Sequence, residues 1–253
     1  MIVQTRREGV YRVFTQHDHG LQCGVLERAL DPSVRYDPWG LPIGMTVALH
    51  DLAWVEVDDW DTCPAEALPW DDARAQPHDF TSMPSDIKAA MYAQGIDELG
   101  RMHPYMGALL NAHYSVFFKS AHPFKDQMDA RAQHWLGKTQ TWEGALPSVE
   151  QRAQHLSLLR FLDMISLFAC MRAPGANLLA CPPWITHEWE HGGALHHMRF
   201  HDPDTLVLTP TPFVRKAHAT IPFRDIRPKE DTPEAWLRAW REAPVEQWRL
   251  VVE

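Results

Sequence analysis

A histidine and an aspartate stand next to each other in VALHDLAW, residues 47–54, a stretch that is otherwise apolar. Imidazole nitrogens and carboxylate oxygens are both common ligands of divalent metals. Neighbouring residues of a helix point about 100° apart, so His50 and Asp51 can share a metal only if it lies between them. The alternatives are a core histidine oriented by Asp51, or an Asp51 on a solvated face. The pair predicts a metal site only if other segments supply further ligands.

Three other residues are candidates for those ligands. His19 begins a predicted helix in TQHDHG, His113 interrupts the apolar run LLNAHYSVFF, and Asp163 lies inside LLRFLDMISLF. Burying a carboxylate is costly unless it is paired or bound to a cation. Arg160, three residues before Asp163, offers an ordinary helix ion pair as the alternative. Together with His50 and Asp51, however, four predicted helices would each supply one or two ligands to a mixed His/Asp site.

A rival motif is HEWEH, residues 187–191, a formal match to the HExxH of zinc peptidases. That motif requires both histidines on one face of a stable helix, with the glutamate as general base. Here CPPWIT precedes it and Gly192–Gly193 follow at once, which leaves little room for a helix. We therefore expect a polar loop or strand edge with surface histidines. The histidines at 196, 197 and 201 are expected in the same loop region.

The elements that must position these residues are mostly helical. Residues 2–14 predict a hairpin that turns at Glu8–Gly9. Helices are predicted over residues 15–30 and 43–54, from a cap at Ser85 or Asp86 towards Gly100, over 104–117 and over 148–175. The last begins with a capping box of Ser148 and Gln151 and stops at Pro174–Gly175. Residues 61–84 are expected to form a long loop. Strands are expected in DTLVLTPTPF, ATIPFRDI and WRLVVE, with a short helix at Pro233–Trp240.

These elements predict a mainly α fold in a single domain of residues 1–253. Residues 15–175 would form the helical core. Residues 1–14 and 176–253 would add a small antiparallel β-sheet, formed by the N-terminal hairpin and the C-terminal strands. The composition, 45% hydrophobic and 23% charged, is typical of a globular protein with a sizeable core.

Charge and cysteine use narrow the choice of partners and compartment. The net charge is −9 and no Lys/Arg-rich run occurs, which argues against nucleic acid or an anionic membrane as a partner. No apolar stretch is long enough to span a membrane, and the N-terminus lacks the apolar region of a signal peptide. The cysteines, which show no CxxC spacing, indicate reduced thiols in a cytoplasmic protein; they are Cys23, Cys63, Cys170 and Cys181.

Five sequence blocks resemble a known family. They are TQHDHGLQCGVL, HDLAW, DFTSMP, PYMGALLNAHY and FLDMISLFAC, between residues 15 and 170. Together they resemble an uncharacterised bacterial group, domain-of-unknown-function family 3891. The order His, His-Asp, late Asp is also similar to the HD superfamily of metal-dependent phosphohydrolases. The resemblance implies an HD-like α-helical core and a divalent metal.

The HD resemblance also implies roles for single residues. His19 matches the first histidine, and His50, Asp51 and Asp163 complete a mononuclear set. Members with two metals take further histidines from the middle helices. His113 fits one of these places, while His103, His122 and His134 compete for the other. His17 is expected to contact the metal ligands without binding the metal itself, or to face solvent.

The expected function is a metal-dependent hydrolase of a phosphate ester or nucleotide-like small molecule, using a metal-activated water. Asp51 would act in catalysis, bridging two metals if two are bound, and His113 would hold the second metal or contact the phosphoryl group. One or two ions of Mn, Fe, Mg, Zn or Ni are expected. A group of basic residues that follows His113 could meet the phosphate or form a solvated helix face; it comprises Lys119, Lys125, Arg131 and Lys138.

Two other functions stay open at this point, as does a homodimer. One is a di-iron oxygenase on the same ligand frame. The other is a binding or structural domain whose histidines satisfy hydrogen bonds in the core.

Overall fold

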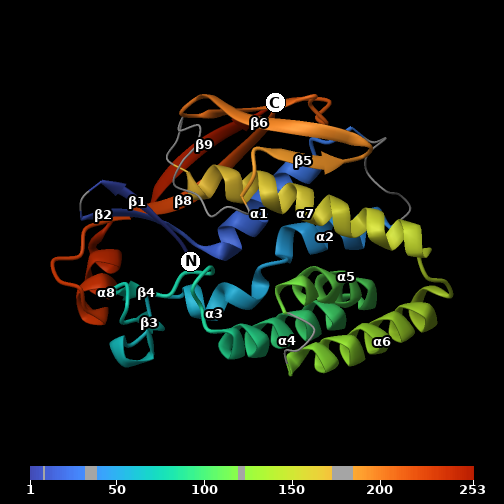
Figure 1. Cartoon of the computed structure of the whole chain (residues 1–253), viewed down its shortest axis with the longest axis horizontal. Coiled ribbons are helices and arrows are strands. Elements are labelled where there is room, and N and C mark those ends of the chain that lie inside the picture. The colour runs from blue at the N-terminus through green and yellow to red at the C-terminus, as the bar shows by residue number, and fades with distance from the viewer. Residues whose placement is uncertain (8, 32–38, 119–122, 173–184) are drawn as a thin grey trace.

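The computed structural model describes the chain except for residues 8, 32–38, 119–122 and 173–184. Three layers are visible in Figure 1. One is a broad sheet, and the next is a middle layer with helices α1 (Gln16–Glu27), α2 (Gly40–Leu49) and α7 (Val149–Met171). The outer layer holds helices α4 (Ser85–Met102), α5 (Pro104–Tyr114) and α6 (Phe124–Glu143). Helix α1 contacts strand β8 (Ala217–Ile226) on one side and α2 on the other, and α7 runs beside α1. The site residues lie in this middle layer and on α5.

Seven strands form one sheet in the order β1-β2-β8-β9-β7-β6-β5. All neighbours are antiparallel except β7 and β9, which are parallel. In β6 the side chains of His196, Met198 and Phe200 are buried and their neighbours face solvent, as a sheet covered on one face requires. The bounds are β1 Ile2–Arg7, β2 Val10–Phe14, β5 Glu188–His191, β6 Ala194–Asp202, β7 Thr205–Thr209, β8 Ala217–Ile226 and β9 Glu246–Val252.

Helices α1 and α7 begin at recognisable capping signals in the sequence. Thr15 caps the first helix by accepting a hydrogen bond from the amide of Asp18 (3.0 Å), and the capping box of Ser148 and Gln151 is present on α7. The bounds are α1 Gln16–Glu27, α2 Gly40–Leu49, α3 Val55–Asp58, α4 Ser85–Met102, α5 Pro104–Tyr114, α6 Phe124–Glu143, α7 Val149–Met171 and α8 Pro233–Glu242. Short 3-10 turns, η2 Leu52–Trp54, η3 Ala65–Ala67 and η4 Ser115–Phe117, and a small hairpin of β3 Trp70–Asp71 and β4 Gln76–Pro77 complete the fold.

Helices α1 and α2 pack unusually closely because α1 carries two glycines on the contacting face. A Cβ added at Gly24 would lie 2.7 Å from Cβ of Ala48, and one at Gly20 would lie 3.1 Å from the Ala48 carbonyl oxygen. Neither position has room for a larger residue. This approach brings His19 on α1 next to His50 at the end of α2.

The expected mainly α, HD-like bundle with a small antiparallel sheet is wrong. The sheet has seven strands and contains a parallel pair. It is larger than expected because residues 188–202, expected as a polar loop or strand edge, form the two strands β5 and β6, with β5 at the edge of the sheet. The N-terminal hairpin and the C-terminal strands do lie in one sheet, with β2 next to β8.

Several predicted boundaries also need correction. The helix expected over residues 43–54 ends at Leu49, and helix α6 was not predicted. Helix α4 begins at Ser85 with Pro84 at the cap position, so neither Ser85 nor Asp86 caps it. Helix α5 ends at Tyr114, and Ser115–Phe117 is a 3-10 turn. The expected stop at Pro174–Gly175 lies outside the described residues.

Within the described part of the chain, no helix is long and apolar enough to cross a membrane. Cys23, Cys63 and Cys170 are free thiols. Cys181 lies outside the described residues.

Candidate metal centre

Four separate segments bring the predicted ligands together. His19 comes from the first turns of α1, His113 from the last turn of α5 and Asp163 from the middle of α7. His50 and Asp51 follow the last residue of α2, where the helix breaks before the turn η2. All of these side chains except Asp163 are buried, and Asp163 is 14% exposed. The break in α2 frees His50 and Asp51 from the divergence that a regular helix would impose.

Asp163 contacts all three histidines. Its Oδ1 lies 2.9 Å from Nε2 of His19 and 3.4 Å from Nε2 of His50, and its Oδ2 lies 3.8 Å from Nε2 of His113. Potential ligand atoms of His50, His113 and Asp163 lie within 4.8 Å of one another. Such a spacing suits a single ion held between an aspartate and two imidazoles.

Asp51 contacts two of the same histidines. Its Oδ2 lies 3.5 Å from Nε2 of His50 and 3.8 Å from Nε2 of His19. Two carboxylates therefore converge on the same two imidazole nitrogens. Among the described residues, Arg160 forms no ion pair with Asp163, so the simple helix pair is not what balances this carboxylate.

The orientation of His50 leaves one ring nitrogen for a cation. Its Nδ1 lies 2.8 Å from the carbonyl oxygen of Val47, which can only accept, so Nδ1 carries the proton. Nε2 is buried without a hydrogen-bond partner among the described residues, and it points at the two carboxylates. A lone pair facing two anions is unfavourable unless a proton or a metal ion lies between them.

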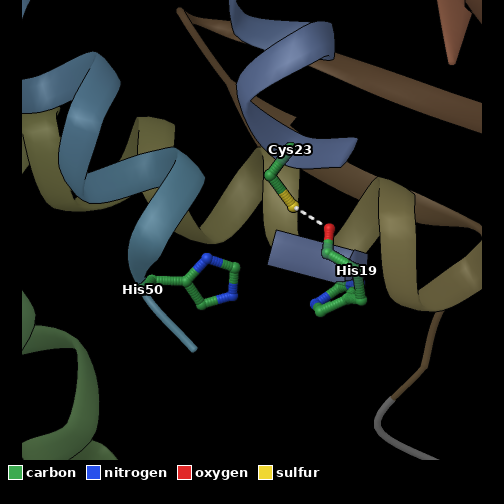
Figure 2. A group of neighbouring side chains, drawn as sticks. All are labelled: His19, Cys23 and His50. Carbon is green, nitrogen blue, oxygen red and sulfur yellow. Dashed lines mark hydrogen bonds between the residues drawn. The ribbon is translucent and has the colours of Figure 1, made fainter. Parts of the chain in front are cut away.

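The rings of His19 and His50 lie nearly perpendicular to each other, with centroids 5.4 Å apart. Figure 2 shows the two rings together with Cys23. Cys23 lies one turn further along α1, and with the two histidines it forms a second group that is compact enough for a metal. Its thiol donates to the carbonyl oxygens of His19 (3.4 Å) and Leu162 (3.5 Å). Burial raises the pKa of the Cys23 thiol well above its usual value. Because metals bind the thiolate, Cys23 is a poor ligand compared with Asp51 and Asp163.

The charges of the cluster also favour the binding of a cation. Burial raises the pKa of Asp51. Burial acts on Asp163 in the same direction, but the neighbouring imidazoles of His19 and His50 outweigh it and hold the pKa of Asp163 well below its usual range. Burial lowers the pKa of His50, but the carboxylates of Asp51 and Asp163 raise it to about 9. The carboxylates thus hold a proton on His50 where a divalent ion would supply the positive charge instead.

His113 differs from the other two histidines. Burial lowers its pKa to about 3, so its imidazole is neutral, the form that binds metals. Its Nδ1 is buried and has no hydrogen-bond partner among the described residues. The ring packs edge to face on His50, with centroids 5.5 Å apart. His113 can therefore add a ligand on the side of Asp163 that faces α5.

A cavity of about 620 Å³ opens onto the cluster. Aromatic side chains form part of its wall, and two cations, Lys88 and Arg160, also line it. Burial lowers the pKa of both side chains. Tyr114 donates its hydroxyl to the carbonyl oxygen of His50 and stacks on Tyr92 at 3.8 Å between centroids, which fixes the end of α2 at the cavity floor. The aromatic lining comprises Phe80, Tyr92, Tyr114, Phe117 and Trp189.

The candidates for a second middle histidine do not reach the cluster. His103 caps α5 and lies 2.9 Å from Glu143, and His134 is exposed beside Trp135. His122 lies outside the described residues. His17 is half-buried and belongs to neither compact ligand group among the described residues.

The basic group expected to meet a phosphate lies elsewhere. Lys125 pairs with Asp129, Arg131 lies 3.5 Å from Asp97, and Lys138 is exposed on α6. Lys119 lies outside the described residues. The cations that line the cavity are Lys88 on α4 and Arg160 on α7. Their place in the cavity follows from how these two helices pack, which the sequence does not show.

Four residues of the HEWEH segment form strand β5, and His187 directly precedes it. The segment is therefore not the helix that a zinc peptidase motif requires. His187 is exposed, as expected. His191 and His196 were expected at the surface but are buried, and His191 stacks on Phe161 with centroids 4.6 Å apart. These two histidines belong to the packing between α7 and the sheet.

The comparison with known families covers most of the chain. The profile of a family described as Protein of unknown function (DUF3891) matches residues 1–227. The chain belongs to this family. Every candidate ligand lies within the matched part of this DUF3891 protein. No curated protein and no solved structure gives a significant match.

Proposed function

We propose that this DUF3891 protein is a metal-dependent hydrolase of small phosphate esters. The observation that carries the proposal is the donor set at the cavity floor, where the carboxylates of Asp51 and Asp163 converge on Nε2 of His19 and on Nε2 of His50. His19, His50, Asp51 and Asp163 would hold the ion. A divalent ion bound there would polarise a phosphoryl oxygen and lower the pKa of a water molecule.

The remaining cavity residues suit an anionic ester. Arg160 and Lys88 line the same cavity as the ligand set, and a guanidinium matches the geometry of a phosphoryl group. The aromatic wall would exclude water and pack against the organic part of the ester. His113, as a neutral imidazole beside Asp163, would contact the phosphoryl group or hold a second ion.

The order of the ligands along the chain supports the same reaction class. It is similar to that of the HD phosphohydrolases, in which a histidine, a His-Asp pair and a late aspartate bind the metal. This support comes from the ligand order alone, because the fold of the chain differs from the expected helical bundle.

Metal analysis and turnover test the proposal together. Protein purified without added metal is assayed for bound Mn, Fe, Zn, Mg and Ni, and then for hydrolysis of p-nitrophenyl phosphate. We expect bound metal and turnover in the wild type, and loss of both in Asp51→Ala. Glu56→Ala serves as the matched control, because Glu56 is an exposed acid five residues further on. Absence of metal binding in the wild type would rule out the enzyme. Two irons per chain with O₂-dependent spectral changes would indicate an oxygenase instead.

A further inference from the structure

The hydroxyl of Ser166 lies behind His19, on the side away from the cavity. Ser166 is fully buried on α7, and its Oγ lies 2.6 Å from Nδ1 of His19. It does not line the cavity, so it cannot contact a substrate there. Its effect on the site must therefore pass through the His19 ring.

Helix α7 holds both nitrogens of that ring. Asp163 and Ser166 are three residues apart on α7 and so project from the same face. Asp163 faces Nε2 of His19 at 2.9 Å, and Ser166 faces Nδ1. Helix α7 alone therefore sets the orientation and position of the His19 imidazole.

The direction of the hydrogen bond follows from the other neighbours of Ser166. Its hydroxyl contacts Oε1 of Gln22 and the backbone carbonyl oxygen of His19 (3.3 Å), and both of these atoms accept. A hydroxyl has one proton to give, so that proton goes to one of these acceptors and a lone pair of Oγ faces Nδ1. The thiol of Cys170 also donates to Oε1 of Gln22, at 3.8 Å, which holds the amide in place. Nδ1 of His19 then carries the ring proton, and Nε2 is left as the ligand atom.

We propose that Ser166, supported by Gln22, is a positioning residue that selects the metal-binding tautomer of His19. The inference rests on the proposed metal centre. Partners behind a ligating histidine fix its tautomer and ring orientation, and their removal weakens metal binding about 10–100-fold. None of the sequence patterns pointed to Ser166, because its role depends on the packing of α1 against α7.

The test measures Zn²⁺ affinity of the full chain by competition with a chelating dye. Ser166→Ala is expected to weaken Zn²⁺ binding about 10–100-fold without a matching loss of Tm. Ser157→Ala is the matched control. Ser157 is also on α7, and its hydroxyl also contacts a histidine, since Oγ lies 3.2 Å from Nδ1 of His191, but that histidine is outside the metal cluster. The control is expected to bind Zn²⁺ like the wild type.

A double-mutant cycle separates a positioning role from general packing. If Ser166 acts through His19, then Ser166→Ala costs little further affinity once His19→Ala is present. Gln22→Leu provides a second variant and is expected to weaken binding in the same direction by a smaller factor. Wild-type affinity in Ser166→Ala, or an equal loss with and without His19, would overturn the inference while leaving the metal centre intact. Absence of Zn²⁺ binding in the wild type would overturn both.

Discussion

Nε2 of His19 and Oδ1 of Asp163 lie 2.9 Å apart, although 144 residues separate them in the chain. The contact joins α1 to α7 at the floor of the cavity, where His50 and Asp51 also converge. The interaction of these two helices therefore determines the geometry of the proposed metal centre. Asp163 also contacts His50 and His113, so its substitution would affect three candidate ligands.

Asp163→Asn should abolish the stabilisation of the protein by metal. An ion at about 100 times its Kd adds about 2.7 kcal/mol to the wild type, or about 5–10 °C in Tm for a chain of this size. The amide lacks the negative charge that faces His19, His50 and His113, so we expect a shift below about 2 °C. Differential scanning calorimetry with and without Mn²⁺ or Zn²⁺ measures the shift. Asp72→Asn, an exposed acid, should retain the full shift; an equal shift in both variants would contradict the ligand role of Asp163.

The candidate ligands could be proposed from the sequence because polar, ionisable residues in apolar segments are costly and therefore conspicuous. His50–Asp51, His113 and Asp163 all stand out in this way. The break in α2 after Leu49 could not be foreseen, since VALHDLAW contains neither glycine nor proline. At the break, the hydroxyl of Tyr114 donates to the carbonyl oxygen of His50, and Nδ1 of His50 donates to the carbonyl oxygen of Val47.

The fold class was missed for a related reason. In β6 the buried residues alternate with exposed ones, but three of the nine residues are histidines, which obscured the period of two. Helix α6 was missed because few apolar residues, Phe124, Met128 and Trp135 among them, mark its buried face. Ser166 and Arg160 are common polar residues of a helix, and only three-dimensional packing shows what they face.

Gly24→Ala should disturb the metal centre without touching a ligand. The new Cβ would lie 2.7 Å from Cβ of Ala48, so α1 and α2 must separate, at a cost of about 1–3 kcal/mol. His19 then moves away from His50, and we expect weaker metal binding as well as a lower free energy of unfolding. Urea denaturation and dye competition measure the two effects.

Two variants test this explanation. Gly137→Ala adds a Cβ at an exposed helical position with nothing within 4 Å, and it should stabilise the protein by about 0.5–1 kcal/mol with unchanged metal affinity. Ala48→Gly in the Gly24→Ala background removes the clashing Cβ and should restore metal binding. Failure of that rescue would mean that the spacing of α1 and α2 does not control the site.

Arg160→Met should weaken the recognition of an anionic substrate while leaving the metal bound. A charged hydrogen bond contributes about 1.5–3 kcal/mol, so kcat/KM for p-nitrophenyl phosphate should fall about 10–100-fold. Arg152→Met, two turns earlier on α7 and not part of the cavity lining, is the matched control. Hydrolysis of the uncharged p-nitrophenyl acetate should change little, if it occurs. Equal losses on both esters would argue against a role for Arg160 in binding the phosphoryl group.

His155 should make the protein less stable as the pH falls. Burial lowers the pKa of His155 to about 4, and its Nδ1 lies 2.6 Å from the hydroxyl of Tyr105. In the unfolded chain the pKa of histidine is about 6.5. Between these values the unfolded state binds more protons, so the contribution of His155 is fully present above about pH 6.5 and is lost as the pH falls towards about 4, by at most about 1.4 kcal/mol per pH unit. His155→Gln should reduce the slope of the free energy of unfolding against pH in this window, measured by urea denaturation at half-unit steps.

His134→Gln, which changes an exposed histidine, should keep the wild-type slope. A His155→Gln slope equal to that of the wild type would show that the buried His155 does not contribute to acid sensitivity.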